Sequence, residues 1–330
     1  MKQTNISVFI PHNGCKNTCS FCNQRTISGH SEQVTPDALY ELLKEQQPHL
    51  KKTDRMAQIA FFGGSFTAID REYMCSLLKV AQEFTKEYPM QFCGIRCSTR
   101  PDCIDDEVLA ILKDYGMTAI ELGAQSMSDE VLCANRRGHS AEDVRKAAEL
   151  IKLYGFELGL QMMTGLYKDT PERCIYTAQE FIKLSPDTVR IYPTVILKGT
   201  ELDELREKGI YNTFSFEATV ELCAELLKMF NDADISVIRM GLHASDDVEN
   251  NMTGGVYHPA LREIVESRLY LEKMLSVTEE GGKYVFYTDK SNISKIIGQG
   301  GYNRNILREK NITFKIKEEK GTMLRAERIN

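Results

Sequence analysis

The sequence has no apolar run that approaches the roughly 20 residues a membrane-spanning helix needs. Its first residues hold one lysine and an apolar stretch of only about five residues, which is too short for a secretory signal. It also contains no internal repeat, low-complexity segment or long linker. These absences argue against membrane-spanning, collagen-like and disordered proteins. We therefore expect a cytoplasmic globular protein with no membrane partner.

A large excess of charge of one sign is also lacking, since 41 Lys and Arg stand against 47 Asp and Glu and the net charge is −6. The whole molecule is therefore not expected to attract nucleic acid, and we expect no DNA partner. The distribution is uneven, however, because residues 290–330 hold ten basic and four acidic side chains, a local charge of +6. The remainder then carries −12, so the sequence describes an acidic body with a basic tail.

Ten cysteines is a high number for a cytoplasmic chain, where a disulfide framework is not expected. Three of them, Cys15, Cys19 and Cys22, lie in one loop with the spacing CxxxCxxC. Soft thiolates suit zinc or iron–sulfur clusters, but a structural zinc site needs four ligands, usually as two separated pairs. Three cysteines leave a cubane cluster one ligand short, and an open iron can bind a substrate or cofactor.

Short apolar runs rich in β-branched and aromatic residues alternate with amphipathic segments, a pattern that predicts βαβ units and a parallel sheet. The predicted strands are 6–10, 59–62, 92–98, 118–123, 157–163, 188–193 and 235–240. Predicted helices include 36–46, 106–116, 141–155, 216–230 and 258–276. Seven strands favour an α/β fold with a partial or full parallel β/α barrel, in which chemistry takes place at the carboxyl ends of the strands. Periodicity alone leaves an open doubly wound sheet as the alternative.

The cysteine loop resembles the signature of the radical S-adenosylmethionine (SAM) superfamily, CxxxCxφC with φ aromatic, and Phe21 occupies that place. The resemblance implies that Cys15, Cys19 and Cys22 hold a [4Fe–4S] cluster whose fourth iron is chelated by SAM. It implies further that an electron from the cluster cleaves SAM to a 5′-deoxyadenosyl radical, which abstracts hydrogen from a substrate. Such a site is expected to be oxygen-sensitive and to need a reductant such as flavodoxin or ferredoxin. The alternative is a loop of buried or zinc-binding cysteines.

Polar groups follow the ends of the other predicted strands. Gly63, Gly64 and Ser65 resemble the family's GGE-like turn, which holds the SAM amine through backbone carbonyls, with Ser65 in place of the acidic residue. The remaining strand-end candidates for contact with SAM or substrate are Ser98, Arg100, Gln125, Gln161 and Arg190. A planar guanidinium suits a carboxylate, so Arg100 or Arg190 is expected to face that of SAM. The alternative for each is a hydrogen bond within the barrel, because buried polar groups need partners.

A closer resemblance rests on FFGGSF, STRPD, ELGAQS, RRGH (136–139) and the segment 190–209. These motifs are similar to the radical SAM portion of the Elongator catalytic subunit and its shorter bacterial relatives, over roughly residues 5–275. Elongator catalytic subunits modify C5 of the wobble uridine in tRNA and carry an acetyltransferase domain that handles acetyl-CoA. The 54 residues after 276 are too few for that domain. Radical chemistry is therefore carried over, whereas carboxymethylation and use of acetyl-CoA are not.

The basic tail contains IIGQGG, which resembles the element of KH domains that joins two helices and clamps a nucleic-acid backbone. We therefore expect a radical SAM core over 1–276 and a small α+β KH-like domain over 277–330, with strands at 283–289 and 312–317 and helices at 291–297 and 302–309. The residues expected to contact RNA are Lys295, Gly298, Gln299, Gly300, Gly301, Arg304 and Arg308. The alternative is a small basic lid that only caps the barrel.

The sequence thus predicts a radical SAM enzyme that modifies RNA, with tRNA as the expected substrate. Two alternatives remain: a radical SAM enzyme acting on a peptide or small metabolite, and an RNA-binding protein whose cluster is structural or redox-sensing. A second cluster at Cys93, Cys97 and Cys103 is set aside, because residues four apart on a strand lie far from each other. His12 and His139 are interpreted as satisfied or surface histidines.

Overall fold

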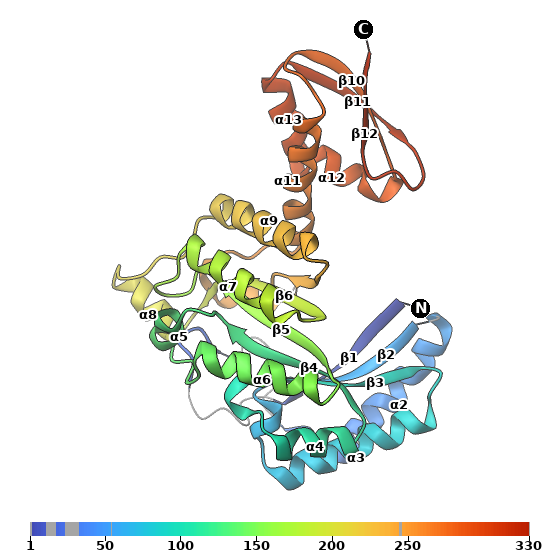
Figure 1. Ribbon diagram of the computed structural model, residues 1–330, viewed down its shortest axis with the longest axis vertical. Coiled ribbons are helices and arrows are strands. Elements are labelled where there is room, and N and C mark those ends of the chain that lie inside the picture. Colours follow the sequence, from blue (N-terminus) through green and yellow to red (C-terminus); the bar gives the residue numbers. More distant parts are fainter. Residues whose placement is uncertain (1, 11–17, 24–32, 54, 244–245, 330) are drawn as a thin grey trace.

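The computed structural model describes residues 2–10, 18–23, 33–53, 55–243 and 246–329. Its main sheet has seven parallel strands in the order β1-β2-β3-β4-β5-β6-β8 (Figure 1). These strands are β1 (Lys2–Ile10), β2 (Arg55–Gly63), β3 (Phe92–Thr99), β4 (Met117–Gln125), β5 (Glu157–Thr164), β6 (Thr188–Pro193) and β8 (Ser236–Met240). A short antiparallel pair, β7 (Val195–Leu197) and β9 (Met252–Gly255), lies outside this sheet.

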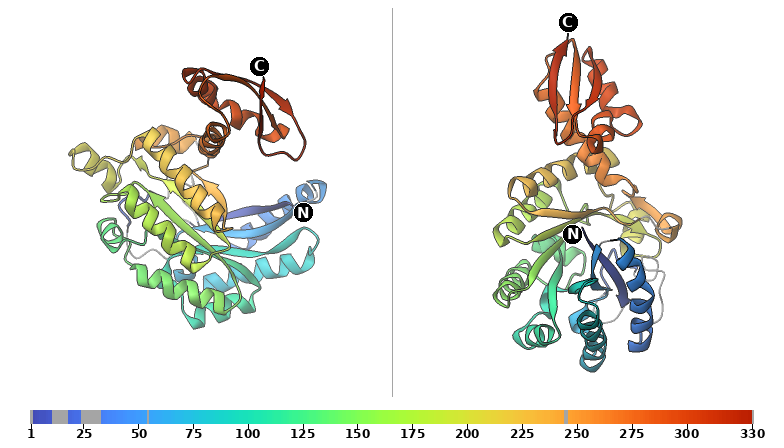
Figure 2. Two further views of the ribbon diagram at one scale, coloured as in Figure 1. Left: turned by 45° about the horizontal axis from the view of Figure 1, so that its top comes forward. Right: turned by 90° about the vertical axis from the view of Figure 1, so that its right-hand side faces the viewer.

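Helices cover the outer face of the sheet (Figure 2). The helices of this part of the chain are α2 (Pro36–Thr53), α3 (Arg71–Glu87), α4 (Asp106–Asp114), α5 (Asp129–Ala134), α6 (Ala141–Leu153), α7 (Pro171–Leu184), α8 (Glu201–Glu207), α9 (Phe216–Asp232), α10 (Asp246–Asn251) and α11 (Leu261–Ser276). Of these, α8 and α10 pack on β7 rather than on the main sheet. Single-turn 3₁₀ helices cover Phe66–Ala68, Pro101–Cys103, Lys290–Asn292 and Gln299–Gly301. No described helix is long and apolar enough to cross a membrane.

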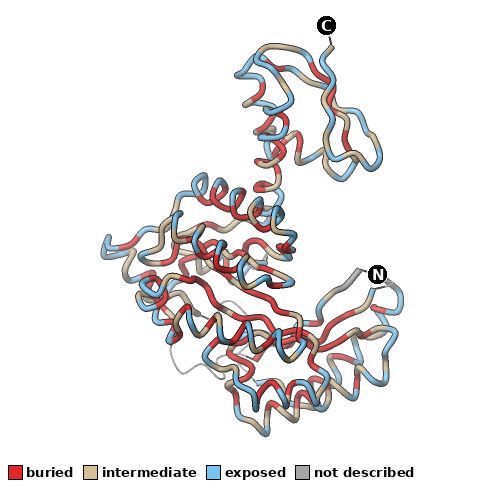
Figure 3. Tube along the Cα trace, in the orientation of Figure 1, coloured by how far each residue is buried: buried red, intermediate tan, exposed pale blue. Residues whose placement is uncertain are grey.

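The sheet curls into a half-barrel (Figure 2) that stays open between its two edge strands, β1 and β8, which do not pair with each other. Alternate residues of each strand point to opposite faces. Ile59 and Phe61 of β2, for example, belong to the core beneath the helices, whereas Phe62 points to the inner face and is only half-buried. The predicted partial β/α barrel is therefore confirmed, and its inner face is the lumen in which polar side chains gather. Figure 3 shows the buried residues concentrated on the strands and on the inward sides of the helices.

Local capping fixes the start of the helix that follows the RRGH segment. Ser140 and Asp143 form a capping box, in which the Ser140 hydroxyl accepts from the Asp143 N–H and the Asp143 carboxylate accepts from the Ser140 N–H. The box holds the first turn of α6 directly after His139. It therefore sets the path of residues 136–139, which run along the carboxyl edge of the sheet.

The C-terminal residues form a second, smaller unit that stands apart from the half-barrel in Figure 1. It comprises β10 (Gly282–Thr288), α12 (Ile293–Ile297), α13 (Tyr302–Glu309), β11 (Ile312–Glu318) and β12 (Arg325–Ile329). The βααβ order expected from the sequence is present, and β12 adds a third strand in the order β11-β10-β12. Helix α11 contributes Leu261 and Val265 to the main core and Tyr270 and Met274 to the small one. The domain boundary after residue 276 stays a prediction.

Candidate functional site

The cysteine loop is fastened to the carboxyl edge of the sheet through Ser20. The Ser20 N–H donates to the Asn135 carbonyl (3.2 Å), and its hydroxyl donates to Asn135 Oδ1 (2.7 Å). The Ser20 carbonyl accepts from the N–H of Leu202 on α8 (2.9 Å). Ser20 is therefore buried, while Cys19 and Cys22 are half-buried and joined by a turn, with Cys22 N–H donating to the Cys19 carbonyl (3.0 Å). Cys15 lies outside the described residues.

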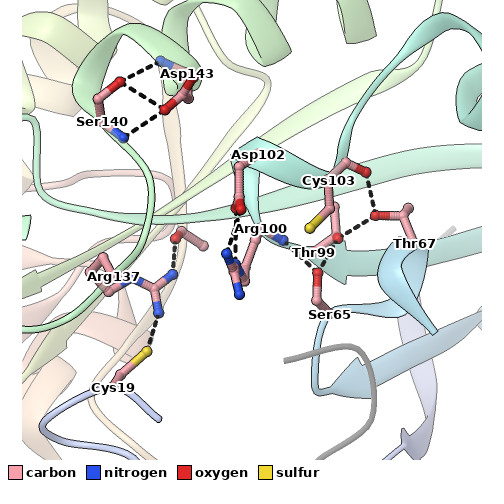
Figure 4. Close-up of polar contacts among 11 residues, drawn as sticks. Cys19, Ser65, Thr67, Thr99, Arg100, Asp102, Cys103, Arg137, Ser140 and Asp143 are labelled. Carbon is pink, nitrogen blue, oxygen red and sulfur yellow. Dashed lines mark hydrogen bonds and ion pairs between the residues drawn. The ribbon is translucent and has the colours of Figure 1, made fainter. Parts of the chain in front are cut away.

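Arg137 connects this loop to the end of β4, as Figure 4 shows. Its Nη1 donates to Cys19 Sγ (3.1 Å) and its Nη2 donates to the Gly123 carbonyl (2.5 Å). Its guanidinium lies 5.7 Å from the centre of the Phe21 ring. A fixed positive charge therefore lies beside the Cys19 thiol. In the sequence, RRGH was one of the motifs that carried the family resemblance and was not a predicted contact of the cysteines. Cys19 and Arg137 are 118 positions apart, so a local sequence pattern does not reveal their contact.

The glycine turn after β2 lies against the end of β1, immediately before the cysteine loop. The Gly64 N–H donates to the Ile10 carbonyl (2.9 Å). Gly63 has φ +113°, and a Cβ there would lie 2.8 Å from the same carbonyl oxygen. Only glycine accepts both that conformation and that approach, and Gly63 is exposed on its other side.

The Ser65 side chain points into the protein rather than out of the turn. It is buried, its hydroxyl lies 2.7 Å from Thr99 Oγ1, and it accepts from the Arg100 N–H (3.1 Å) (Figure 4). Ser65 therefore joins the glycine turn to the end of β3. The guanidinium of Arg100 forms a two-pronged ion pair with Asp102, with Nε 2.9 Å from Oδ1. A carboxylate of the chain itself thus faces the Arg100 guanidinium.

Polar side chains of several strands meet in the lumen around Glu121 of β4, which is 3% exposed. Its carboxylate accepts from Arg190 Nε of β6 (2.5 Å) and from the Ser98 hydroxyl of β3 (3.2 Å). Arg96 Nη2 lies 3.7 Å from the same carboxylate, and Arg96 Nη1 donates to Gln58 Oε1 (3.1 Å). The lumen therefore holds two guanidinium groups, those of Arg96 and Arg190, around the Glu121 carboxylate. The Ser98 hydroxyl belongs to the same hydrogen-bonded cluster.

Gln125 and Gln161 lie on the neighbouring strands β4 and β5. Gln125 ends β4 with φ +67°, a conformation that non-glycine residues seldom adopt. It is 5% exposed, and its Oε1 is buried without a hydrogen-bond partner among the described residues. Gln161 pairs in register with Arg190 of β6 and is half-buried in the lumen. An orphaned acceptor held by a strained backbone is typical of a site that awaits a donor group from a ligand.

These features fit a cluster and SAM at this edge of the sheet. Among the described residues no group of three metal-ligating side chains is complete, since the third thiol of the motif belongs to Cys15. Cys19 and Cys22 are soft ligands within reach of solvent, which suits iron and sulfide. The turn at Gly63 is exposed and offers backbone to an amine, and Gln125 Oε1 offers an acceptor to a hydroxyl.

His139 is buried directly behind this edge, at 8% exposure. Its Nε2 lies 3.1 Å from the Ala124 carbonyl and therefore donates, while Nδ1 is buried without a partner among the described residues. Burial, and then the charge of Arg137, lower the pKa of the imidazole from 6.5 to about 4. His139 is thus a buried histidine with one nitrogen satisfied, and it is neutral at physiological pH.

The free energy of unfolding is expected to fall as the pH falls. The reason is that His139 takes up a proton in the unfolded chain but stays neutral in the folded one. The unfolded state binds this proton below pH 6.5 and the folded state only near pH 4. Between pH 7.5 and pH 5, His139 should therefore cost the wild type about 2 kcal/mol of unfolding free energy, a loss that His139→Gln avoids. Urea unfolding at the two pH values measures the difference. Equal pH dependence of the two proteins would contradict the prediction.

The residues expected to contact RNA lie around the turn between α12 and α13. Lys295 is paired with Glu266 of α11 (2.7 Å), and the Gln299 amide lies 3.3 Å from His258 Nε2. Gly298 is buried against Asn303, whose N–H would lie 2.8 Å from a Cβ there. A Cβ at Gly300 or Gly301 would meet no atom within 4 Å. Arg304 and Arg308 are exposed on α13. The turn thus combines two open glycines with contacts to the core.

Comparison with protein families gives two matches. Residues 9–181 match the model of the radical SAM superfamily, and residues 186–271 match that of the radical SAM C-terminal domain. The chain belongs to the radical SAM superfamily. Members of this superfamily use a [4Fe–4S] cluster and SAM, the pair of cofactors expected from the cysteine loop.

The curated relatives of this radical SAM protein include tRNA uridine(34) acetyltransferases and Elongator complex protein 3. It is 31% identical over 192 residues to a tRNA uridine(34) acetyltransferase of Methanocaldococcus infernus, covering 52% of this chain and 35% of the relative. It is 28% identical over 243 residues to human Elongator complex protein 3, covering 68% and 44%. The chain therefore spans less than half the length of these two relatives. The solved structure of archaeal Methanocaldococcus infernus Elp3 shares the fold, with a TM-score of 0.63 at 22% identity over 82% of this chain and 63% of that one.

Proposed function

We propose that this radical SAM protein is an enzyme that modifies tRNA by hydrogen abstraction. The observation that carries the proposal is the fastening of the cysteine loop, by Ser20 to Asn135 and by Arg137 to Gly123, beside an exposed glycine turn. A cluster that served only structure would have no use for the exposed, tightly folded turn at Gly63 or for the orphaned acceptor of Gln125. The tRNA part rests on relatives whose names include tRNA uridine(34) acetyltransferase.

Each part of the site has a role in this proposal. Cys15, Cys19 and Cys22 ligate the cluster, and the backbone of Gly63, Gly64 and Ser65 holds the SAM amine. Bound together, cluster and SAM supply a 5′-deoxyadenosyl radical. Candidate contacts with the rest of SAM and with the substrate are Phe21, Ser98, Arg100, Gln125, Gln161 and Arg190.

The lumen side chains orient these ligands and exclude water, since an unshielded radical would be quenched. Ser98 and Arg190 are held by Glu121 and thus present fixed polar groups. Gln125 Oε1 accepts from a ligand hydroxyl. The bond of Ser65 to Thr99 keeps the glycine turn in place while SAM is absent.

The small C-terminal unit supplies the RNA contacts in this proposal, through the open glycines of the turn and the exposed Arg304 and Arg308. Cationic side chains and helix N-termini attract phosphates. A flavodoxin or ferredoxin in the cytoplasm delivers the electron.

Two measurements test the proposal. The chain is reconstituted without air and incubated with SAM and a reductant, and 5′-deoxyadenosine is quantified. Nucleosides of tRNA from cells with and without the gene are then compared by mass spectrometry. We expect 5′-deoxyadenosine, and a nucleoside that disappears without the gene. Absence of 5′-deoxyadenosine from fully reconstituted protein would favour a structural or redox-sensing cluster. Its formation with unchanged tRNA nucleosides would favour a peptide or small-metabolite substrate.

A further inference from the structure

The described helices that pack on the small C-terminal sheet cover one of its faces and leave the other face without a helix. Residues alternate between the two faces of each strand. Tyr284 and Phe286 of β10 point to the core that α11, α12 and α13 share, and Figure 1 shows α11 and α13 on that side of the strands. The opposite face consists of Lys283, Val285, Tyr287, Thr313, Lys315, Lys317, Arg325, Glu327 and Ile329, as the strand register places them. We call these nine residues the open face, and Val285 at its centre is only 5% exposed beneath its longer neighbours.

The open face is strongly basic, with four cations and one carboxylate, a surplus of +3. Arg325 is paired with Glu319 (3.1 Å) and Glu327 (3.8 Å). Lys315 and Lys317, together with Lys283, are exposed and have no ion-pair partner among the described residues. Three unneutralised lysines on a surface of three short strands fit a polyanion with regularly spaced charges.

An aromatic platform lies within this charge. The Arg325 guanidinium stacks on the ring of Tyr287, with Cζ 3.8 Å from the ring centre. Lys317 Nζ lies 5.7 Å from the same centre, and the Tyr287 hydroxyl donates to Glu327 (2.9 Å), which fixes the ring. Unpaired RNA bases stack on aromatic rings and on arginine planes, while neighbouring cations contact the phosphates.

The glycine turn offers less charge by comparison. Its own cation, Lys295, is already neutralised by Glu266, and Gln299 is engaged with His258. Arg304 of α13 lies 5.9 Å from the ring of Phe314 on the edge strand β11, and that ring packs on the helix-covered face of the sheet.

We propose that the open face binds an unpaired stretch of RNA, with a base stacked on the Tyr287–Arg325 pair and phosphates on Lys283, Lys315 and Lys317. This proposal rests on the proposed function for the presence of RNA, and it places the main contact on the sheet rather than on the glycine turn. It assigns Tyr287, outside the turn, as the residue on which affinity depends most.

The test uses the full chain and a fluorescein-labelled unpaired RNA of about 12 nucleotides, followed by fluorescence anisotropy at several salt concentrations. Tyr287→Ala is expected to weaken binding about tenfold, whereas Tyr287→Phe keeps the ring and stays within about threefold of wild type. Lys315→Gln with Lys317→Gln should reduce the slope of log affinity against log salt by about 1.4, since each phosphate contact contributes about 0.7. Lys79→Gln with Lys86→Gln on α3 makes the same charge change away from the face and should leave binding unchanged.

Other outcomes separate this proposal from the one on which it rests. Wild-type affinity in Tyr287→Ala and in the double lysine variant, with loss of binding in Gln299→Asp plus Gly300→Asp, would move RNA to the turn and overturn the open face while RNA modification stands. If light scattering finds a dimer that Tyr287→Ala dissociates without a change in RNA affinity, the face is a contact between copies and the proposal is wrong. The 5′-deoxyadenosine and nucleoside measurements do not depend on any of these variants.

Discussion

Replacing Cys19 by alanine is expected to abolish iron binding and 5′-deoxyadenosine formation while the fold survives. A cluster with three protein ligands loses one of the three bonds that hold it to the chain. Substituting an outer partner of a metal ligand typically costs about 10–100-fold in affinity, so loss of the ligand itself should exceed about 100-fold. The loop should keep its place, because Ser20 rather than Cys19 anchors it to Asn135. Iron and sulfide per chain after anaerobic reconstitution measure the effect.

Cys133→Ala is the matched control for this experiment. Cys133 is an exposed cysteine on α5, two residues before the Asn135 that holds the loop. Its removal should leave iron content and 5′-deoxyadenosine unchanged, because a thiol outside the motif contributes no ligand. A Cys19→Ala protein that still binds iron as wild type does would show that another group ligates the metal. The circular-dichroism spectrum of both variants should match that of the wild type, which separates loss of metal from loss of fold.

The sequence predicted the half-barrel well because its strands carry their own signal. A buried parallel strand must be apolar on the face beneath the helices, and β-branched and aromatic runs such as 188–193 are visible without knowledge of the partner strands. The ends of the helices were harder to predict from the sequence. The helix expected over 36–46 continues to Thr53, past Pro48, and Leu50 in that extension is buried against the core. Burial of this kind depends on distant residues, so local patterns miss it.

The candidate site was predictable only as far as its motifs are contiguous. Cys15, Cys19, Cys22 and the glycine turn stand out because each motif is compact in sequence. Arg137 did not stand out as a site residue, since its role depends on a sulfur 118 residues away and a carbonyl 14 residues away. The direction of a side chain was likewise invisible. Ser65 was expected in the cofactor turn, and only the packing against Thr99 reveals that its hydroxyl points inward.

The open face of the C-terminal sheet is a second feature that depends on contacts between residues far apart in the sequence. The basic character of the tail is visible in the sequence, and the IIGQGG motif drew attention to one turn. The register of β10 with β11 and β12 then gathers Tyr287, Lys317 and Arg325 on one surface, although they span 39 residues of chain. Charge along the sequence thus predicts that a polyanion binds, whereas strand pairing decides where.

Replacing Glu121 by glutamine is expected to give the largest loss of stability among single substitutions in the lumen. Glutamine keeps the size and shape of the side chain but removes its charge. The change leaves Arg190 and Arg96, whose side chains are 11% and 6% exposed, without a counter-charge. Removing one partner of a buried ion pair typically costs about 3–5 kcal/mol, because the remaining charge stays desolvated and unpaired. Urea unfolding at neutral pH, followed by circular dichroism, measures the loss.

Two further variants identify the cause of that loss. Glu204→Gln removes the acidic partner of Lys208 in a pair that is more than 60% exposed on both sides, and should cost less than about 1 kcal/mol. Arg96→Gln combined with Glu121→Gln removes one of the two uncompensated guanidinium groups. If unpaired charge is the cause, the double variant is more stable than the sum of the two single effects predicts, since residues in one network do not act independently. If the two losses of unfolding free energy are additive, or if Glu121→Gln is as stable as wild type, then solvation by water, and not the charge of Glu121, stabilises the lumen arginines.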